Sequence, residues 1–277
     1  MAVVPLRRSF AVAAAGLAAV AAAIAVLFAG SGPPAAAPEL GEFPVEGPLA
    51  YKVEYLGVTC GHMSLESRRA NFRGRDAYHV VMTARNSDFF NKIYRVDGRI
   101  ESWVDAATMS TMAYRSDITE KGERDIRQYV IDRERNVVVA EKDGKIEEVP
   151  FEAGAALDPL AFIFRGRVLA GYPGTSFSLR LLTDKGVIET VTRVVEFKGM
   201  STFEGRRVLL GVQPLTTDSE MFARKGEFSY WIDPGPQRTL YLLDFKLGFG
   251  RLVARLMGPA DGDFDRRDLA QGPTNSN

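Results

Sequence analysis

The segment DPLAFIFRGRVLAGY, residues 158–172, carries signals for both ends of a helix. Asp158 can accept hydrogen bonds from the first free amides of a helix, and Pro159 suits the first helical position. Gly171, followed closely by a proline, indicates where the helix ends. Segments with strand-like composition lie on both sides. The sequence therefore predicts one packed helix, over about residues 158–170, within an otherwise β structure.

Short strand-like segments make up most of the chain between residues 49 and 256. They are rich in β-branched and aromatic residues, and several alternate apolar with polar positions. Two strands are expected to meet near Gly61, and Asp143 with Gly144 suits a two-residue turn. Without alternation of strand and helix, these segments predict a mainly β fold, a curved antiparallel sheet forming a barrel, half-barrel or sandwich. The other expected strands cover residues 77–84, 93–104, 128–132, 136–141, 145–149, 176–181, 187–197, 207–213, 227–232 and 240–256.

The first 32 residues have the character of a signal peptide or a signal anchor. Arg7 and Arg8 precede an uncharged, Ala-rich run over residues 10–32, which would form an apolar helix. Its length is close to the ~20 residues that span a bilayer, which favours an uncleaved anchor in the inner membrane. The arginine pair also resembles a twin-arginine signal, so that route and the general secretory route both stay open.

The remaining boundaries follow from composition. Residues 33–48 are rich in Pro and Ala and predict a tether, and residues 49–257 predict a single β-rich domain. Residues 258–277 are expected to be a disordered tail. We therefore expect an exported domain in the periplasm or the cell envelope.

Composition argues against several classes of function. Lys plus Arg and Asp plus Glu both number 35, so no net positive charge favours nucleic acid. Cys60 is the single cysteine and the chain has two histidines, which excludes an internal disulfide and leaves little material for zinc. The sequence has no Gly-rich phosphate loop and no hydrolase serine motif. We expect neither a cofactor nor a metal.

Cys60 and His62 lie two residues apart on an expected strand and should face the same side. Zinc would need two further ligands, and only His79 is left among the histidines. A nucleophilic Cys60 with His62 or His79 as base is an enzymatic alternative, although no motif accompanies it. The simpler interpretation is a small buried thiol beside a hydrogen-bonded imidazole, and we expect no catalytic residue.

The helical projection of the 158–172 segment places Arg167 on its apolar side, beside Leu160 and Val168. A guanidinium there must be paired, reach an anion, or extend its head to water along its own aliphatic stem. One hypothesis is that this arginine meets a ligand headgroup at the mouth of an apolar cavity. The residues predicted to line that cavity are Phe162, Phe164, Arg165, Arg167, Trp103 and Tyr230.

Five blocks follow one another along the chain: YKVEYLGVTCGHMSLES, IYRVDGRIESWVD, LDPLAFIFRGRVL, GEFSYWIDP and LDFKLGFGRLVARL. In this order, over about residues 49–256, the sequence resembles the exported bacterial proteins of domain-of-unknown-function family 3108. The resemblance implies an envelope-located or secreted, mostly antiparallel β-protein of Gram-negative type bacteria. It implies no established activity and no catalytic residue.

These observations predict a non-catalytic envelope domain that binds a lipid or another amphiphile in an apolar cavity capped by the helix. The alternative is a solid-cored structural protein whose partner is another envelope protein. An enzyme that uses Cys60 with a histidine is the third hypothesis. Nucleic acid is not an expected partner, and the membrane is contacted through residues 10–32 if the signal is not cleaved.

Overall fold

The computed structural model describes residues 42–91, 96–120, 122–142, 145–150, 156–183, 186–215, 227–247 and 250–260. The predicted N-terminal helix, most of the tether and most of the tail lie outside these residues. The strands are β1 (Glu46–Tyr55), β2 (Val58–Phe72), β3 (Arg75–Asn86), β4 (Val96–Asp105), β5 (Thr111–Glu120), β6 (Glu123–Asp132), β7 (Val137–Lys142), β8 (Lys145–Pro150), β9 (Ala156–Leu157), β10 (Ser176–Thr183), β11 (Gly186–Thr202), β12 (Gly205–Leu215), β13 (Glu227–Ile232), β14 (Leu240–Leu247) and β15 (Gly250–Pro259). The helices are α2 (Asp88–Asn91) and α3 (Pro159–Leu169).

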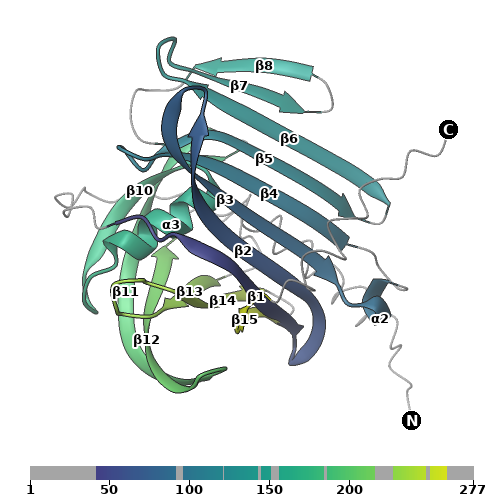
Figure 1. Ribbon diagram of the computed structural model, residues 1–277, viewed down its shortest axis with the longest axis vertical. Coiled ribbons are helices and arrows are strands. Elements are labelled where there is room, and N and C mark those ends of the chain that lie inside the picture. The colour runs from purple at the N-terminus through teal and green to yellow at the C-terminus, as the bar shows by residue number, and fades with distance from the viewer. Residues whose placement is uncertain are drawn as a thin grey trace.

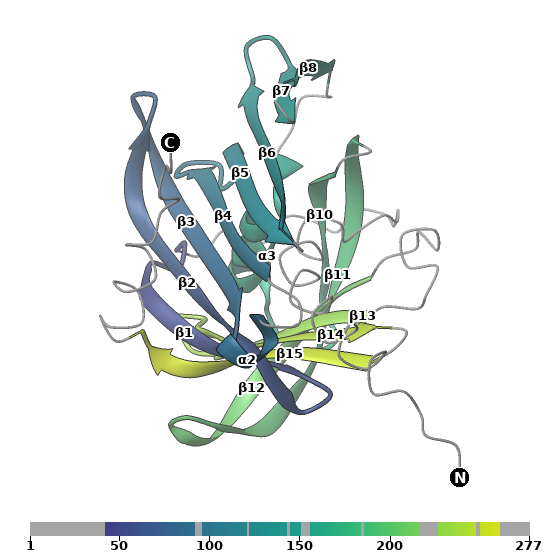
Figure 2. The ribbon, with the colours of Figure 1, turned by 90° about the vertical axis from the view of Figure 1, so that its right-hand side faces the viewer.

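All fifteen strands belong to one sheet, in the order β8-β7-β6-β5-β4-β3-β2-β1-β15-β14-β13-β12-β11-β10-β9. Neighbours are antiparallel except for the short parallel pair β9–β10. The sheet curls around α3, as Figures 1 and 2 show, but its end strands β8 and β9 do not pair with each other. The mainly β class predicted from the sequence is confirmed, in the form of an unclosed, curved sheet.

The two end regions of the sheet contact each other through side chains and not through backbone hydrogen bonds. Ile131 and Val138, from β6 and β7, form a small buried cluster with Ala156 of β9 and Leu182 of β10. The two ends of the sheet therefore approach each other through apolar packing rather than through a continuous ladder.

Several local expectations differ from the structure. No turn occurs at Gly61, because the chain reverses at Leu56 and Gly57 and β2 runs through Gly61. Leu56 and Gly57 both have positive φ, 50° and 81°, which suits a tight turn. Strand β5 was not predicted, since its second half, RSDITE, has no clean alternation of apolar and polar residues. Strands β14 and β15 pair antiparallel, with Leu247 opposite Gly250, so the segment expected over residues 240–256 is a hairpin.

Helix α3 lies inside the curve of the sheet and packs against β4, β9 and β10. Its buried residues are Pro159, Leu160, Ala161, Phe162, Ile163, Phe164, Gly166 and Arg167, so apolar burial extends around the helix. The sequence predicted that this helix has one buried face and caps an apolar cavity as a lid. The structure instead places the helix within the fold, because the sheet surrounds it on more than one side.

Asp158 fixes the N-terminal end of α3, as predicted. One carboxylate oxygen accepts hydrogen bonds from the amides of Leu160 and Ala161, at 2.9 and 3.1 Å. The other accepts from the hydroxyls of Ser102 on β4 and Thr111 on β5, at 2.5 and 2.6 Å. Complete burial raises the pKa of Asp158, and these hydrogen bonds oppose that shift. The cap thus also holds the helix against strands β4 and β5.

Arg167 fixes the C-terminal end of α3 to β1 and to the β13–β14 turn. Its guanidinium donates to both carboxylate oxygens of Glu46 at the start of β1, at 2.9 and 2.7 Å. Its Nε donates to the carbonyl of Arg238 in the β13–β14 turn, at 2.8 Å. The guanidinium also lies 4.5 Å from the ring centroid of Phe164. Arg167 is 0% exposed, so it does not extend to water.

The fold begins earlier than the predicted boundary at residue 49. Phe43 is buried, and its ring stacks on Tyr78 and Phe164 with centroid distances of 4.2 and 5.2 Å. Ser67 donates a hydrogen bond to the carbonyl of Pro44 at 2.7 Å. The last residues of the predicted tether are therefore part of the packed domain.

We expect Glu46→Gln to destabilise the fold by about 3–5 kcal/mol, because it leaves the buried Arg167 charge without its counter-ion. The double variant Glu46→Leu with Arg167→Met should recover a large part of this loss, since it removes both charges. Urea unfolding followed by circular dichroism measures both effects. The exposed pair Lys246–Glu227, at 3.2 Å, is the control, and Lys246→Ala should cost less than about 1 kcal/mol.

Candidate functional site

The concave face of the sheet beside α3 carries two rows of side chains in register. The row nearer the helix C-terminus, called the helix row, joins Tyr230, Leu243, Ala254 and Val53 across β13, β14, β15 and β1. The next row, called the aromatic row, joins Phe228, Phe245, Leu252 and Tyr55 across the same strands. Phe228 and Phe245 stack with centroids 4.6 Å apart. All eight side chains are buried.

The same concave face on β2, β3 and β4 has unusually small residues beside two methionines. Met63 pairs with Ala84, and Ala84 pairs with Gly98. Val53 of the helix row pairs with Gly61. Glycine and alanine add little volume to a concave face, whereas methionine is a flexible apolar residue that adapts to the shape of its neighbours.

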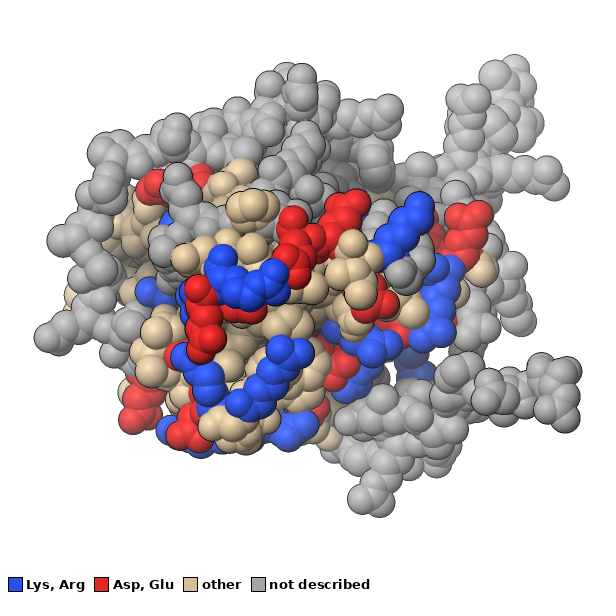
Figure 3. Space-filling view, turned by 90° about the horizontal axis from the view of Figure 1, so that it is seen from above, with Lys and Arg blue, Asp and Glu red and all other residues tan. Residues whose placement is uncertain are grey.

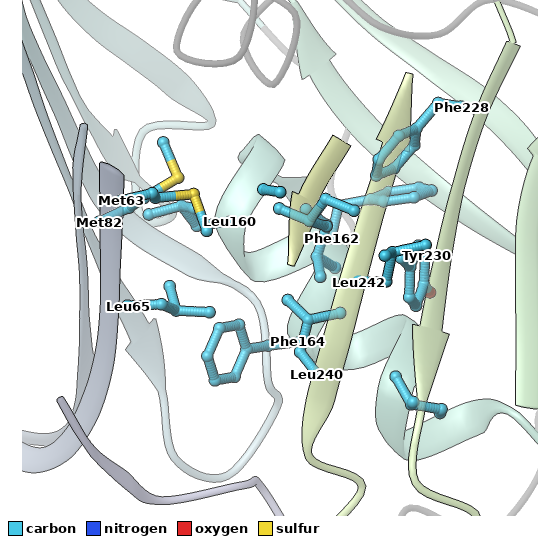
Figure 4. Packing of buried hydrophobic residues seen from close by; sticks show 14 of the residues in the cluster. Met63, Leu65, Met82, Leu160, Phe162, Phe164, Phe228, Tyr230, Leu240 and Leu242 are labelled. Atoms are coloured by element: carbon cyan, nitrogen blue, oxygen red, sulfur yellow. The ribbon is translucent and has the colours of Figure 1, made fainter. Parts of the chain in front are cut away.

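Figure 4 shows how these surfaces lie around the helix. Met63 and Met82 extend from one wall, Phe228 and Tyr230 from the other, and Leu160 and Phe162 of α3 lie between them. We call this set, with the aromatic row and the small residues, the inner apolar surface. The 11 residues of α3 span about 16 Å, whereas the 15 residues of β2 span roughly 50 Å, so the helix covers only part of the concave face.

Two buried hydroxyls of β11 face this interior. Thr190 and Thr192 of β11 are both 0% exposed, and their Oγ1 atoms have no hydrogen-bond partner among the described residues. They pair in register with Leu179 and Phe177, whose side chains are buried in the interior. A buried hydroxyl without a partner costs about 1–3 kcal/mol, so such groups are usually satisfied by water or by a ligand.

The structure brings together four of the six predicted cavity residues. Phe162, Phe164 and Arg167 are fully buried on α3, and Tyr230 contacts the helix at Gly166. A Cβ atom at Gly166 would lie 2.1 Å from the Tyr230 hydroxyl, so only glycine allows this contact. The Tyr230 hydroxyl has no hydrogen-bond partner among the described residues, and burial raises its pKa.

The other two predicted residues lie elsewhere. Arg165 is half-buried and donates to the carbonyl of Thr108 at 2.7 Å, outside the inner apolar surface. Trp103 is on the opposite face of β4 from Ser102, whose hydroxyl reaches Asp158, so it points away from the interior. Sequence reasoning missed the aromatic row and the small residues, because which positions share a register row depends on strand pairing.

Arg167 does not offer its charge to a ligand, because Glu46 already occupies both terminal nitrogens. The proposed role of Arg167 as a headgroup contact is therefore not available in this arrangement. Its partner lies 121 residues away in the sequence, and no local pattern indicated it.

His79 belongs to a separate cluster on the outer face. Its Nδ1 accepts from Arg68 at 2.9 Å, because arginine can only donate, and its Nε2 therefore donates to Glu101 at 3.2 Å. Its ring stacks on Trp103 with a centroid distance of 4.6 Å. Arg99 also donates to Glu101, at 3.0 Å. Both ring nitrogens are thus engaged, and neither is available as a base or a metal ligand.

Cys60 is buried away from that cluster. The register shift between β1 and β2 leaves Cys60 as the extra residue of a bulge, which breaks the alternation expected to align it with His62. Its Sγ donates to the carbonyl of Val53 at 3.5 Å. Burial raises the pKa of the Cys60 thiol to about 11. His79 lies seven residues from the partner of Gly61 on β3, roughly 20 Å away.

The described residues contain no group of three His, Cys, Asp or Glu side chains placed to hold a metal ion. Within the same part of the chain, no helix combines the length and apolar character that a membrane span requires. On the face shown in Figure 3, Lys and Arg alternate with Asp and Glu over the described residues, with no large area of one sign.

The comparison with protein families decides the classification. The family model described as protein of unknown function (DUF3108) matches residues 50–257. The chain belongs to this family. The DUF3108 match leaves out Phe43 and Glu46, although both are packed into the domain. No curated protein matches the sequence.

Several solved structures align with this DUF3108 chain at low identity. A β-barrel-like protein of domain of unknown function DUF1849 from Brucella abortus aligns with a TM-score of 0.50 and 10% identity, over 80% of this chain and 100% of its own. A Bacteroides fragilis protein with a YmcC-like fold, provisionally described as exported, aligns with a TM-score of 0.30 and 11% identity, over 80% and 100%. A Parabacteroides distasonis protein, provisionally described as a lipoprotein, gives 0.28 and 10%, over 79% and 98%.

The outer-face cluster predicts a pH dependence. Hydrogen bonds from His79 and then Arg99 lower the pKa of Glu101 from 4.5 to about 2, against the effect of its partial burial. A carboxylate whose pKa is lowered by folding stabilises the fold above its unfolded pKa, and this stabilisation is lost as the pH falls through the folded value.

We therefore expect the wild-type chain to be more stable than Glu101→Gln by roughly 1–2 kcal/mol above about pH 5. The difference should shrink between pH 4.5 and about 2. Urea unfolding at a series of pH values measures it. A difference that stays constant over this range would contradict the assigned ion pairs.

Proposed function

We propose that this envelope domain binds an amphiphile with a long apolar chain, such as a fatty acid or a phospholipid, without catalysing a reaction. The apolar chain would lie against the inner apolar surface, beside the α3 side chains Leu160 and Phe162, which stand between the methionine wall of β2 and β3 and the opposite wall. The observation that carries the proposal is the presence of three small residues, Gly61 and the paired Ala84 and Gly98, on a concave face that α3 covers only in part.

Physical reasons connect this observation to a ligand. Protein interiors pack to the density of organic crystals, so a concave face lined by glycine and alanine needs apolar material from elsewhere. Aromatic and methionine side chains are typical of sites that bind apolar ligands. The Thr190 and Thr192 hydroxyls supply polar contacts on the same interior, where a carboxylate or ester could accept hydrogen bonds.

The second candidate is a solid-cored protein that acts through its surface. The burial of α3 and the paired state of Arg167 favour it, because this part of the interior is filled by the protein itself. Here α3 closes one region of the interior instead of opening as a lid. The two candidates differ in whether a chain-like molecule copurifies with the domain or binds to it.

Catalysis by Cys60 has less support. A thiol with a pKa of about 11 is almost entirely protonated at neutral pH, whereas the nucleophile is the thiolate. The predicted export and envelope location remains part of the proposal and rests on the sequence of residues 1–32.

Filling the concave face should block binding. We expect Gly98→Val to weaken uptake of a fluorescent fatty acid by about tenfold or more, because overpacking such a site costs about 1–3 kcal/mol. Valine is favoured in strands, so the fold itself should tolerate the change. Fluorescence titration measures the affinity, and native mass spectrometry with lipid extraction identifies any copurified molecule.

The matched control is Glu66→Val on β2, which adds the same side chain at a half-buried position paired with Val81 on the outer face. It should leave the affinity unchanged. A wild-type chain that carries no lipid and takes up neither fatty acid nor phospholipid would sink the binding proposal and favour the solid-cored alternative.

The two threonines test the polar part of the site. Thr190→Val with Thr192→Val keeps the shape of both side chains, and it should stabilise the ligand-free chain by roughly 1 kcal/mol because two unpaired hydroxyls are removed. Dodecanoate binding should weaken by about threefold to tenfold. Urea unfolding and isothermal titration calorimetry measure the two effects. Unchanged dodecanoate affinity would show that these hydroxyls hold only water.

A further inference from the structure

Three buried hydroxyls lie around the side chain of Phe177, beside α3 and strands β10, β11 and β13. Thr192 is in register with Phe177, and Thr190, two residues earlier on β11, faces the same side of the sheet. The Tyr230 hydroxyl and the tip of the Phe177 ring lie 2.1 and 3.9 Å from the position that a Cβ atom of Gly166 would occupy, so these two groups are neighbours. We call the hydroxyls of Thr190, Thr192 and Tyr230 the hydroxyl set.

The hydroxyl set is fully buried and unsatisfied by the described part of the chain. All three residues are 0% exposed, and none of the three oxygens has a hydrogen-bond partner among the described residues. Such groups are costly, so three of them in one region indicate a polar group that the chain itself does not supply. Burial raises the pKa of the Tyr230 hydroxyl, which therefore stays protonated and able to donate.

The described interior offers no cation to balance an anionic headgroup. Arg167 is the one buried Lys or Arg in the described ranges, and Glu46 occupies both of its terminal nitrogens. Arg165 is directed to the carbonyl of Thr108, outside the inner apolar surface. Asp158, the buried acid at the start of α3, cannot balance an anion. Moving an unpaired carboxylate or phosphate into such a region is very costly, so the charge balance favours a neutral headgroup.

We propose that the hydroxyl set binds the uncharged headgroup of an acyl ester, such as a monoacylglycerol. The inference rests on the proposed function and narrows it, because it selects a neutral ligand from the wider class of amphiphiles. Hydroxyl groups donate and accept, so they suit both the ester carbonyl and the free hydroxyls of such a headgroup. Tyr230 also belongs to the inner apolar surface, along which the acyl chain extends. A fatty acid enters this site only as the protonated, neutral acid.

The pH dependence of binding separates a neutral ligand from an anionic one. Isothermal titration calorimetry on the full-length chain compares monododecanoylglycerol with dodecanoate between about pH 6 and pH 9. We expect the affinity for the ester to stay constant over this range. The affinity for dodecanoate should fall about tenfold for each pH unit, because a carboxyl group ionises at about pH 4 to 5 and only its neutral form binds.

A tyrosine variant tests the contact with the headgroup. Tyr230→Phe removes one hydroxyl of the set and keeps the ring that packs on Gly166. We expect it to weaken monododecanoylglycerol binding by about threefold to tenfold without lowering the urea midpoint of the ligand-free chain. The matched control is Tyr51→Phe, because this equally buried tyrosine donates to the carbonyl of Leu240 at 2.7 Å. The control should lower the urea midpoint and leave the affinity unchanged.

The possible failures are distinguishable. Dodecanoate that binds as tightly at pH 9 as at pH 6 would overturn the uncharged headgroup and leave the amphiphile proposal standing. An ester affinity that is unchanged both in Tyr230→Phe and in Thr190→Val with Thr192→Val would show that the hydroxyl set holds only water, which also overturns the inference. If neither probe binds at any pH, the proposed function fails and the headgroup inference fails with it.

Discussion

The buried ion pair between Arg167 and Glu46 is the contact on which the rest of the arrangement depends. A barrel that closes through hydrogen bonds holds its own curvature, but in this sheet the end strands β8 and β9 do not pair with each other. Helix α3 spans the interior instead, joined to β4 and β5 through Asp158 and to β1 through Arg167. An isolated charge in this interior would be very costly, so the pair also specifies how β1 must sit relative to the helix.

This use of the helix determines what the interior can do. Since α3 fills one region and is held at both ends, the adaptable region is the concave face beside it, where methionine, glycine and alanine replace larger side chains. A helix held at both ends, beside an adaptable apolar surface, is compatible with an amphiphile carrier and with a structural protein. The hydroxyls of Thr190 and Thr192, which have no hydrogen-bond partner in the described part of the chain, are the feature that a purely solid core explains least well.

Sequence reasoning succeeded where the signal was local. The cap at Asp158, the helix that follows it and the meander of β6, β7 and β8 were predicted, because capping and turn chemistry act over a few residues. It failed at Gly61, where a strand continues through a glycine, and at β5, whose polar residues hide its strand character. The helical projection noted that Arg167 intrudes on an apolar face, but the partner that satisfies it could not be read from the sequence.

The sequence by itself determined that this DUF3108 chain is mainly β, that it contains one well-capped helix, and that its charges are balanced. Those properties follow from residue type and short-range periodicity. Only the tertiary structure decided that α3 lies inside the sheet, that Trp103 points outward, and that Phe228, Phe245, Leu252 and Tyr55 share one row. The physical reason is that strand pairing and buried ion pairs join residues far apart in the chain, and their register is set by packing across the whole sheet.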